Sequence, residues 1–383
     1  MDASPDAAGS STPAPAYAEL HALSNFSFLR GASHAAELIQ RARELGYAAL
    51  ALTDECSMAG VVRAHMAAKE AGLPLVVGAE FTLECGLKIV ALAATRRGYG
   101  QVCQLITRGR RAAPKGTYRL TREDLADCIP GAHQPPVAVA AAPDVEPDCL
   151  LVWRPEAAVL ASPAMAREQG QWLAARYPRN LWLGVSLLRT GQDASLLRAC
   201  LDLAALLGIG CVACGDVHMH AAARRKVQDA ITAIRHRVPL REAGRRLFPN
   251  GERHLRAREE LARLYPAALL AESVAIAARC RFSLDELRYQ YPREIVPEGE
   301  TPASYLRRLT EQGAAERWPQ GIPVAVRALI EKELAIIAQL QYEPFFLTVH
   351  DVVQHARGEG ILCQGRGSAA NSIVCYCLKV TSV

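Results

Sequence analysis

The sequence predicts an α/β fold for residues 16 to about 285, because short apolar runs alternate there with helix-like segments. The segments between the runs have the length and composition of helices, as in βα units. No repeat with a period of about 20 to 50 residues is present, so a solenoid is not expected. The expected strands are residues 48–52, 75–77, 88–92, 181–185 and 211–214.

Polar residues follow three of these expected strands. Thr53-Asp54-Glu55 follows the first, Glu80 the second and Asp216-Val217-His218 the last. In a barrel-like α/β fold the carboxyl ends of the strands meet at one face, where active sites are assembled. We therefore expect these polar side chains to gather in one candidate site.

Length suggests at least one large domain, and the charge pattern indicates a basic segment that either binds a polyanion or simply faces solvent. The chain has 383 residues, is 50% hydrophobic and carries a net charge of +5, enough to form two domains or one large domain and part of another. Residues 224–258 hold eleven Lys or Arg against Asp229, Glu242 and Glu252. Such a cluster suits a polyanion partner. A solvated Arg-rich surface has equal weight, because few aromatic residues are interleaved for base stacking.

Cysteine usage indicates a reducing, cytoplasmic location. Of twelve cysteines, only Cys211 and Cys214 form a Cys-x-x-Cys, and no second pair follows at zinc-ligand spacing. We expect most of them, including Cys375 and Cys377, to be small core residues. Residues 1–15 are rich in Ala, Ser and Pro, which predicts a disordered tail and not a signal peptide. No apolar run approaches the roughly 20 residues that cross a bilayer, so no membrane partner is expected.

The segment Gln364-Gly365-Arg366-Gly367-Ser368 has the composition of a phosphate cradle. Two glycines allow close approach of the backbone, the arginine can bind phosphate oxygens, and the serine adds a hydroxyl at the start of an expected helix. Gly365, Arg366, Gly367 and Ser368 are therefore candidate triphosphate ligands. The alternative is an ordinary strand-to-helix turn after the apolar run that ends at Cys363.

Residues 342–353, followed by this turn, resemble the start of the palm in bacterial C-family DNA polymerases. In that family the Gly-Arg-Gly-Ser turn contacts the triphosphate of the incoming nucleotide, and downstream aspartates hold two catalytic Mg²⁺ ions. No such Asp-rich strand occurs here. The resemblance implies that the parent protein is a DNA-directed DNA polymerase, a nucleotidyltransferase that uses Mg²⁺. It implies that residues 286–383 are the start of the palm, and that this fragment cannot polymerise and needs no cofactor.

A second resemblance covers residues 16–285, where four motifs match those of the PHP domain in the same order. It implies a PHP-type distorted (β/α)7 barrel. In active members such a site binds a cluster of divalent metals and hydrolyses phosphoesters, which in some polymerases provides a proofreading exonuclease. The matching segments are residues 17–27, 51–60, 78–81 and 215–218.

The departures from the PHP pattern predict a degenerate pocket. Leu23, Arg30, Glu55 and Lys88 stand where the family has metal ligands, and one expected ligand near Cys149 has no clear counterpart. A unit cation about 5 Å from a divalent ion adds repulsion on the order of 6 kcal/mol at an effective dielectric near 20. We therefore expect no metal and a structural network in which Arg30 and Lys88 pair with Glu80, Asp216, Asp54 or Glu55. The family's ligands that remain are His21, Glu80, Asp216 and His218.

Residues 25–33, 53–57 and 365–372 most resemble the error-prone branch of the polymerase family. That branch implies translesion synthesis and damage-induced mutagenesis, hence DNA repair and DNA replication in the cytoplasm. The implied partners are a DNA primer-template, deoxynucleotides, accessory mutagenesis proteins and a sliding clamp. Two alternatives remain: an active metal-dependent PHP phosphoesterase or 3′-5′ exonuclease, and a non-enzymatic scaffold that docks accessory mutagenesis proteins.

Overall fold

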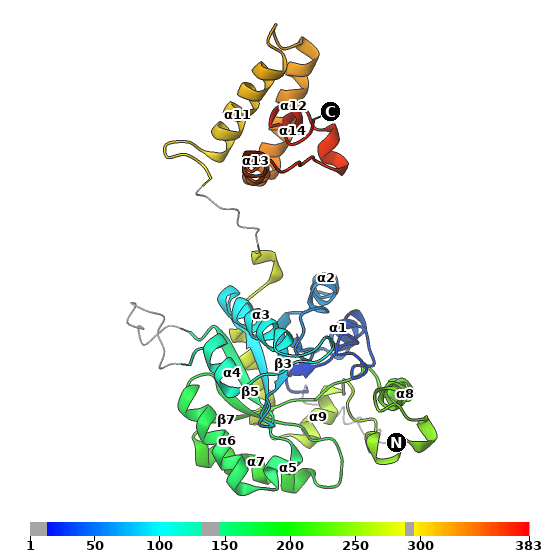
Figure 1. Cartoon of the computed structure of the whole chain (residues 1–383). Coiled ribbons are helices and arrows are strands. Elements are labelled where there is room, and N and C mark those ends of the chain that lie inside the picture. The colour runs from blue at the N-terminus through cyan, green and yellow to red at the C-terminus, as the bar shows by residue number, and fades with distance from the viewer. Residues whose placement is uncertain (1–13, 132–145, 288–294, 383) are drawn as a thin grey trace, which may run out of the picture. The chain divides into compact units, whose positions relative to one another are not determined.

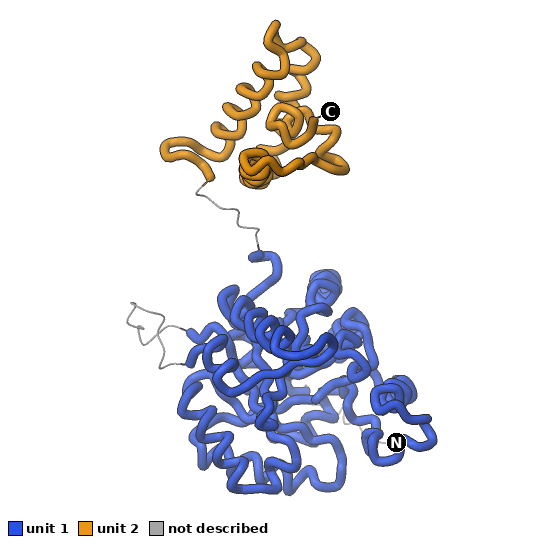
Figure 2. The backbone as a smooth tube through the Cα atoms, in the orientation of Figure 1, with its two compact units in different colours: residues 1–287 blue, residues 288–383 orange. Residues whose placement is uncertain are grey.

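The computed structural model describes residues 14–131, 146–287 and 295–382. The backbone divides into two compact units, residues 1–287 (unit 1) and residues 288–383 (unit 2) (Figure 2). The disordered tail expected for residues 1–15 falls almost entirely outside the described residues. Within the described residues, every helix is too short or too polar to cross a bilayer.

Unit 1 is built on one sheet of seven strands in the order β1 to β7. All neighbouring pairs are parallel except those of β4, which runs antiparallel to β3 and β5. A parallel bridge between Ala22 and Val217 joins the end of β1 to the segment after β7, so the sheet curls toward closure. The strands are β1 (Ala18–Ala22), β2 (Ala49–Leu52), β3 (Leu75–Thr82), β4 (Lys88–Ala93), β5 (Cys149–Trp153), β6 (Leu181–Val185) and β7 (Gly210–Ala213). The predicted α/β fold with seven strands is confirmed.

All five predicted strands are present, and two further strands were not predicted. β1 carries the polar residues Glu19 and His21 within five buried positions, which hides its strand character. β5 is apolar throughout, but the Pro- and Ala-rich sequence before it gives no regular flanking pattern. Both strands bring polar residues to the candidate site, as described below.

Helices surround the sheet of unit 1 (Figure 1). Their ends follow local sequence rules: the Thr95 and Thr121 side chains accept from backbone amides at the starts of α3 and α4, and left-handed Gly72 and Gly208 end α2 and α7. The α-helices are α1 (Ala35–Glu44), α2 (Val61–Ala71), α3 (Arg96–Arg111), α4 (Arg122–Cys128), α5 (Ala157–Leu160), α6 (Pro163–Arg176), α7 (Asp193–Leu207), α8 (Arg225–Arg235), α9 (Arg258–Leu264) and α10 (Ala267–Arg279). The 3-10 helices are η1 (Ala222–Arg224), η2 (Leu240–Glu242), η3 (Gly244–Arg246) and η4 (Leu284–Glu286).

Two apolar clusters occupy the two faces of the sheet. One joins residues of the strands to the helices outside the sheet, including α1, α2, α3 and α7. The other joins side chains from all seven strands to Ile276 and Ala277 of α10, and Ser273 of the same helix accepts a hydrogen bond from the Ala18 amide at 3.1 Å. Helix α10 therefore fills the inner face of the curled sheet.

The regular elements among the described residues of unit 2 are all helices. An apolar core that includes Leu306, Ile330, Leu347 and Val374 holds its helices together. All twelve cysteines of the chain are free thiols, and seven of them, including Cys375 and Cys377, are buried, as expected for small core residues. The helices are α11 (Pro302–Arg317), α12 (Val324–Leu340), α13 (Glu343–Gly358), η5 (Gly367–Asn371) and α14 (Ile373–Cys377).

Candidate functional site

Three buried side chains from separate parts of the sheet meet at the end of the barrel. His21 lies on β1, Glu80 on β3, and Asp216 follows β7. His21 Nε2 is 2.8 Å from Glu80 Oε2, and His21 Nδ1 is 3.3 Å from Asp216 Oδ1. One ligand atom from each residue lies within 4.8 Å of the others. This spacing alone would suit one metal ion.

Local backbone geometry positions His21 and Asp216. Glu19, buried on β1, accepts hydrogen bonds from the Gly215 amide, the His21 amide and the Tyr17 hydroxyl at 2.8–2.9 Å. A Cβ at Gly215 would lie 2.2 Å from Glu19 Oε2, so only glycine fits there. The contact places Asp216, whose φ is +49°, directly beside β1.

Four positively charged side chains enter the same pocket. Arg30 Nη1 lies 2.6 Å from both Glu80 and Glu55, and Lys88 Nζ lies 3.4 Å from Glu80. Arg154 Nη1 donates to Asp216 at 2.8 Å and also contacts His21, while Arg253 pairs with the other Asp216 oxygen. The carboxylates that would hold a metal are thus all paired with cations of the chain itself.

These charges set the protonation states of the buried groups. Burial would raise the pKa of Glu80, but Arg30, His21 and Lys88 outweigh burial and hold that pKa well below its usual value. Burial and the charge of Arg154 lower the pKa of His21 to about 3. Burial and the charge of Arg30 likewise lower the pKa of His218 well below its usual value. Both rings are therefore neutral at pH 7.

The structure places the other predicted pocket residues differently. Asp54 has no ion-pair partner among the described residues. It accepts hydrogen bonds from the amides and hydroxyls of Ser24 and Ser27 at 2.7–3.1 Å and so holds the loop after β1. Leu23 is fully buried, and its amide donates to Val217. His218 Nε2 is 3.5 Å from Asp216 Oδ1, and its ring packs edge-on against Phe248.

Sequence reasoning missed two of the four cations. Arg154 directly follows β5, so the rule that predicted Asp216, a polar residue after an apolar strand, applies to it as well. Glu80 was also expected to follow its strand, but β3 continues to Thr82 and includes it. Arg253 lies in the basic segment 224–258 and has no local signal. Its backbone oxygen accepts from the amides of His218 and Met219, and this pairing brings Arg253 to the pocket.

The predicted phosphate cradle lies in an irregular part of unit 2. Gly367 has a φ of +62°, and the Gly365 amide donates to the Val380 oxygen at 2.7 Å. Arg366 is exposed and has no ion-pair partner within the described residues. Among the described residues no strand precedes the turn, so it is not the ordinary strand-to-helix turn of the alternative interpretation, and Leu362 is fully exposed. Ser368 does lie at the start of a helix, as expected, but this helix is the short 3-10 helix η5, and the α-helix α14 begins only after Ser372.

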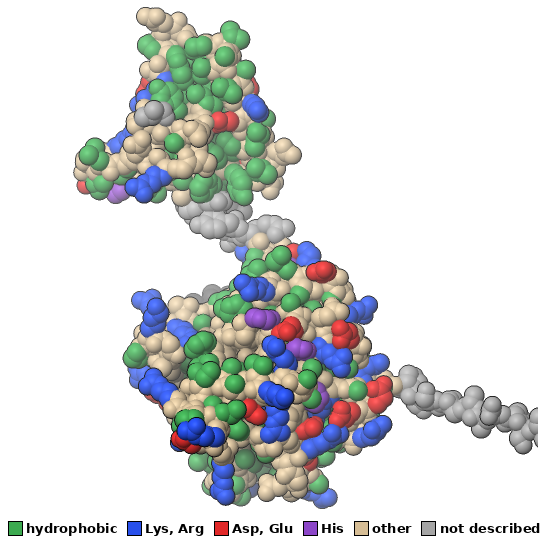
Figure 3. Space-filling view, turned by 90° about the vertical axis from the view of Figure 1, so that its right-hand side faces the viewer, with side chains coloured by type: hydrophobic (Ala, Val, Ile, Leu, Met, Phe, Trp, Pro, Cys, Tyr) green, Lys and Arg blue, Asp and Glu red, His purple; other side chains and the backbone are tan. Residues whose placement is uncertain are grey.

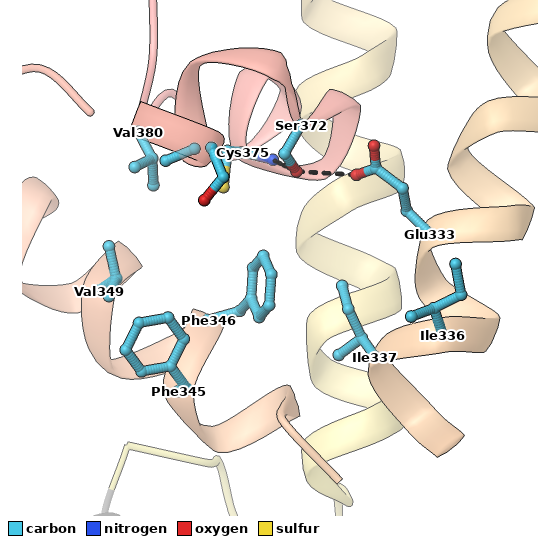
Figure 4. A pocket seen from close by; sticks show the side chains of 11 residues that line it. Glu333, Ile336, Ile337, Phe345, Phe346, Val349, Ser372, Cys375 and Val380 are labelled. Atoms are coloured by element: carbon cyan, nitrogen blue, oxygen red, sulfur yellow. Dashed lines mark hydrogen bonds between the residues drawn. The ribbon is translucent and has the colours of Figure 1, made fainter. Parts of the chain in front are cut away.

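An apolar pocket of about 340 Å³ lies beside this turn, and Ser368 and Ala369 form part of its wall. Glu333 of α12 lies at its edge and accepts from the Ser372 hydroxyl at 2.7 Å and from the amides of Ile373 and Val374 at 3.1 Å (Figure 4). Glu333 therefore caps α14 and fixes the end of the η5 segment. The other lining residues are Ile336, Ile337, Phe345, Phe346, Val349, Cys375 and Val380.

In comparison with known proteins, each unit contains a segment that matches a protein-family model. The PHP domain model matches residues 19–134, and the model of the bacterial DNA polymerase III alpha NTPase domain matches residues 304–383. An error-prone DNA polymerase of Methylococcus capsulatus is 57% identical over 96% of this chain and 33% of its own length. One from Pseudomonas aeruginosa is 56% identical with the same coverage. The chain thus spans about a third of the length of the curated relatives it matches.

Among solved structures, a candidate metal-dependent phosphoesterase from Bifidobacterium adolescentis is 18% identical over 54% of this chain and 88% of its own chain. Its TM-score is 0.33. A likeness at this level carries no argument about activity.

Proposed function

Because this chain is homologous over 96% of its length to bacterial error-prone DNA polymerases, we propose that it forms the PHP domain and part of the polymerase module of such an enzyme. The whole enzyme then transfers a nucleotidyl group: the primer 3′-hydroxyl attacks the α-phosphate of a deoxynucleotide and pyrophosphate leaves. Mg²⁺, when bound, stabilises charge on the attacking and leaving oxygens. We propose that the carboxylates for these ions lie in the part of the relatives that this chain does not span.

In this scheme residues 365–368 hold the triphosphate of the incoming nucleotide. Two observations support the assignment: the Arg366 guanidinium is exposed and unpaired in the described structure, and Gly367 takes a left-handed conformation that few other residues adopt. Guanidinium groups bind phosphate through two parallel hydrogen bonds. We also propose that the whole enzyme acts in translesion synthesis and damage-induced mutagenesis with accessory proteins and a sliding clamp, which extends the error-prone polymerase activity named for the relatives.

Arg366→Ala in the full-length polymerase is expected to weaken deoxynucleotide binding about 10- to 150-fold, the equivalent of about 1.5 to 3 kcal/mol for a lost charge-assisted contact. Nucleotide titration of a primer-template complex measures it. Arg357→Ala is the matched control, because Arg357 is also exposed and lies at the end of α13. Equal nucleotide affinities for the two variants would reject the cradle.

We further propose that the PHP pocket is structural and not catalytic. The observation that carries this proposal is that Arg30, Lys88, Arg154 and Arg253 pair with the carboxylates of the pocket. His21, Glu80 and Asp216 are spaced for one ion, but a divalent cation there would face four positive charges. At an effective dielectric near 20, each one about 5 Å away opposes the ion by on the order of 6 kcal/mol. The residues present therefore do not fit a metal cluster.

A hydrolysis assay tests this proposal. The purified chain, with Mn²⁺ or Zn²⁺ added, is expected to leave a 3′-labelled single strand and a generic phosphomonoester intact, and elemental analysis is expected to find no tightly bound metal. Chelator serves as the control for metal dependence. Metal-dependent cleavage that disappears in Asp216→Ala would instead show an active phosphoesterase or 3′-5′ exonuclease.

A further inference from the structure

The cations of the basic segment 224–258 fall into two groups: side chains that bond to other residues of unit 1, and side chains that are exposed to solvent. Five of the eleven cations bond to other groups of the fold, four of them to residues outside the segment. Arg225 donates to the Phe248 oxygen at 3.3 Å, Arg256 to the Leu187 oxygen at 2.9 Å, and Arg258 to the Leu45 oxygen at 3.2 Å. Arg224 and Arg253 pair with Glu37 and Asp216. For these five of the eleven cations, the contacts within unit 1 indicate a structural role.

The other six cations are exposed and form what we call the basic surface. They come from α8, the turn after it, and η2 to η3. In the described structure only Arg241 has an ion-pair partner, Glu242 at 3.4 Å, and both side chains are more than half exposed, so this pair stabilises little. The basic surface consists of Lys226, Arg235, Arg237, Arg241, Arg245 and Arg246.

The segment that carries the basic surface is held firmly. Gln228, Thr232 and Ala233 of α8 are buried beneath it. Beyond η3, the Asn250 side-chain amide donates to the Leu188 oxygen at 2.6 Å, and the Arg253 guanidinium lies 4.2 Å from the centre of the Phe248 ring while it pairs with Asp216. The pocket at the barrel end therefore anchors this segment. The backbone that carries the exposed cations is therefore held in place, which lowers the ordering cost of binding a regular array of charges.

Helix α8 lies at the margin of unit 1 (Figure 1). Figure 3 views unit 1 from that side and shows Lys and Arg side chains across the face, with acidic ones among them. Because acidic side chains lie among the basic ones, the face as a whole is not uniformly positive. The excess of cations belongs to α8 and to η2 to η3, where Glu242 is the only exposed carboxylate of residues 224–250.

We propose that the basic surface binds the sugar-phosphate backbone of DNA without reading its sequence. Five of its six members are arginines, whose planar guanidinium groups match phosphate oxygens. No exposed aromatic side chain lies among residues 224–247 to stack on bases. The proposal rests on the proposed polymerase function, which supplies DNA as the polyanion. The basic surface would add a second contact to DNA, outside the polymerase module.

Fluorescence anisotropy of the purified chain with labelled single-stranded and duplex DNA tests the basic surface, over about 50 to 200 mM salt. The test variant replaces Arg235, Arg241, Arg245 and Arg246 with glutamine. The control variant replaces four other exposed arginines whose side chains have no partner in the described structure, Arg43, Arg111, Arg167 and Arg263. Both lose the same charge, and thermal melting checks that both remain folded.

The test variant is expected to bind DNA at least about 10-fold more weakly than the control, with a shallower salt dependence by roughly one unit of slope for each lost phosphate contact. Equal affinities for the two variants would overturn the proposal. So would displacement of DNA by polyglutamate at equal charge concentration, which would indicate an acidic protein as the partner.

This experiment uses neither nucleotide nor primer extension, so its failure is distinct from failure of the proposed function. If the full-length enzyme extends primers and the test variant binds DNA as tightly as the control, only the proposed DNA contact of the basic surface is rejected. A full-length protein that does not extend primers rejects the polymerase assignment, whatever the titration shows.

Discussion

Glu80→Ala is expected to lower the free energy of unfolding of unit 1 by about 3 to 5 kcal/mol. Glu80 is fully buried and lies within 3.9 Å of Arg30, Lys88, Arg154 and His21. Its removal leaves buried cations without their shared carboxylate, and they cannot regain the hydration lost on folding. Urea unfolding of the purified chain at pH 7 measures the change.

Glu44→Ala provides the matched control. Glu44 also pairs with an arginine, Arg41 at 3.0 Å, but both side chains are exposed, and such pairs contribute at most about 1 kcal/mol. A loss for Glu80→Ala no larger than that for Glu44→Ala would mean that the pocket is hydrated. It would also remove the argument that the ion-pair network supports the fold.

Much of the pocket was predictable because strand ends and motifs converge on it. Asp216 and Glu80 follow apolar runs in the sequence, and such runs are predicted to form buried strands of a sheet. Because the sheet is curled, the ends of these strands bring both side chains to His21. Arg253 was not predictable in this way. It reaches Asp216 through backbone pairing with His218 and Met219. No periodic pattern of apolar and polar residues indicates such a pairing between distant segments.

The segment before the phosphate turn shows the limit of apolar patterning. Ile361 and Leu362 suggest a buried strand, yet both are exposed, and no strand of unit 2 is available among the described residues to pair with them. Strand formation requires a hydrogen-bonding neighbour, which a local sequence does not reveal. The same reasoning applies to the basic segment, because only burial separates Arg256, which bonds within the core, from the exposed Arg245.

The pH dependence of stability is expected to report on His218. Its pKa is lowered in the fold by burial and by Arg30, while Glu80 opposes the shift and His21 and Lys88 add to it. Asp216 lies 3.5 Å from its ring. In the unfolded chain histidine titrates near pH 6.5. As the pH falls below that value, the unfolded chain gains a proton that the folded ring does not take up, so stability present above about pH 6.5 is lost toward lower pH.

Between about pH 7.5 and pH 5.0, unit 1 is therefore expected to lose about 2 kcal/mol more stability than the variant His218→Gln. The comparison with the variant is necessary because other buried groups titrate too. The pKa of His21 is also lowered, whereas burial raises the pKa of Glu19 and of Asp54, which acts in the opposite direction. These contributions remain in both proteins and cancel in the difference.

Urea unfolding at each pH gives the two stability curves, and His236→Gln, at an exposed position directly after α8, is expected to follow the parent curve. Parallel curves for the parent and His218→Gln would show that the folded ring takes up a proton in this range. The cations of the pocket would then not keep His218 neutral, and the pocket would tolerate additional positive charge. Because the argument against a divalent ion depends on the same repulsion, that outcome would weaken it as well.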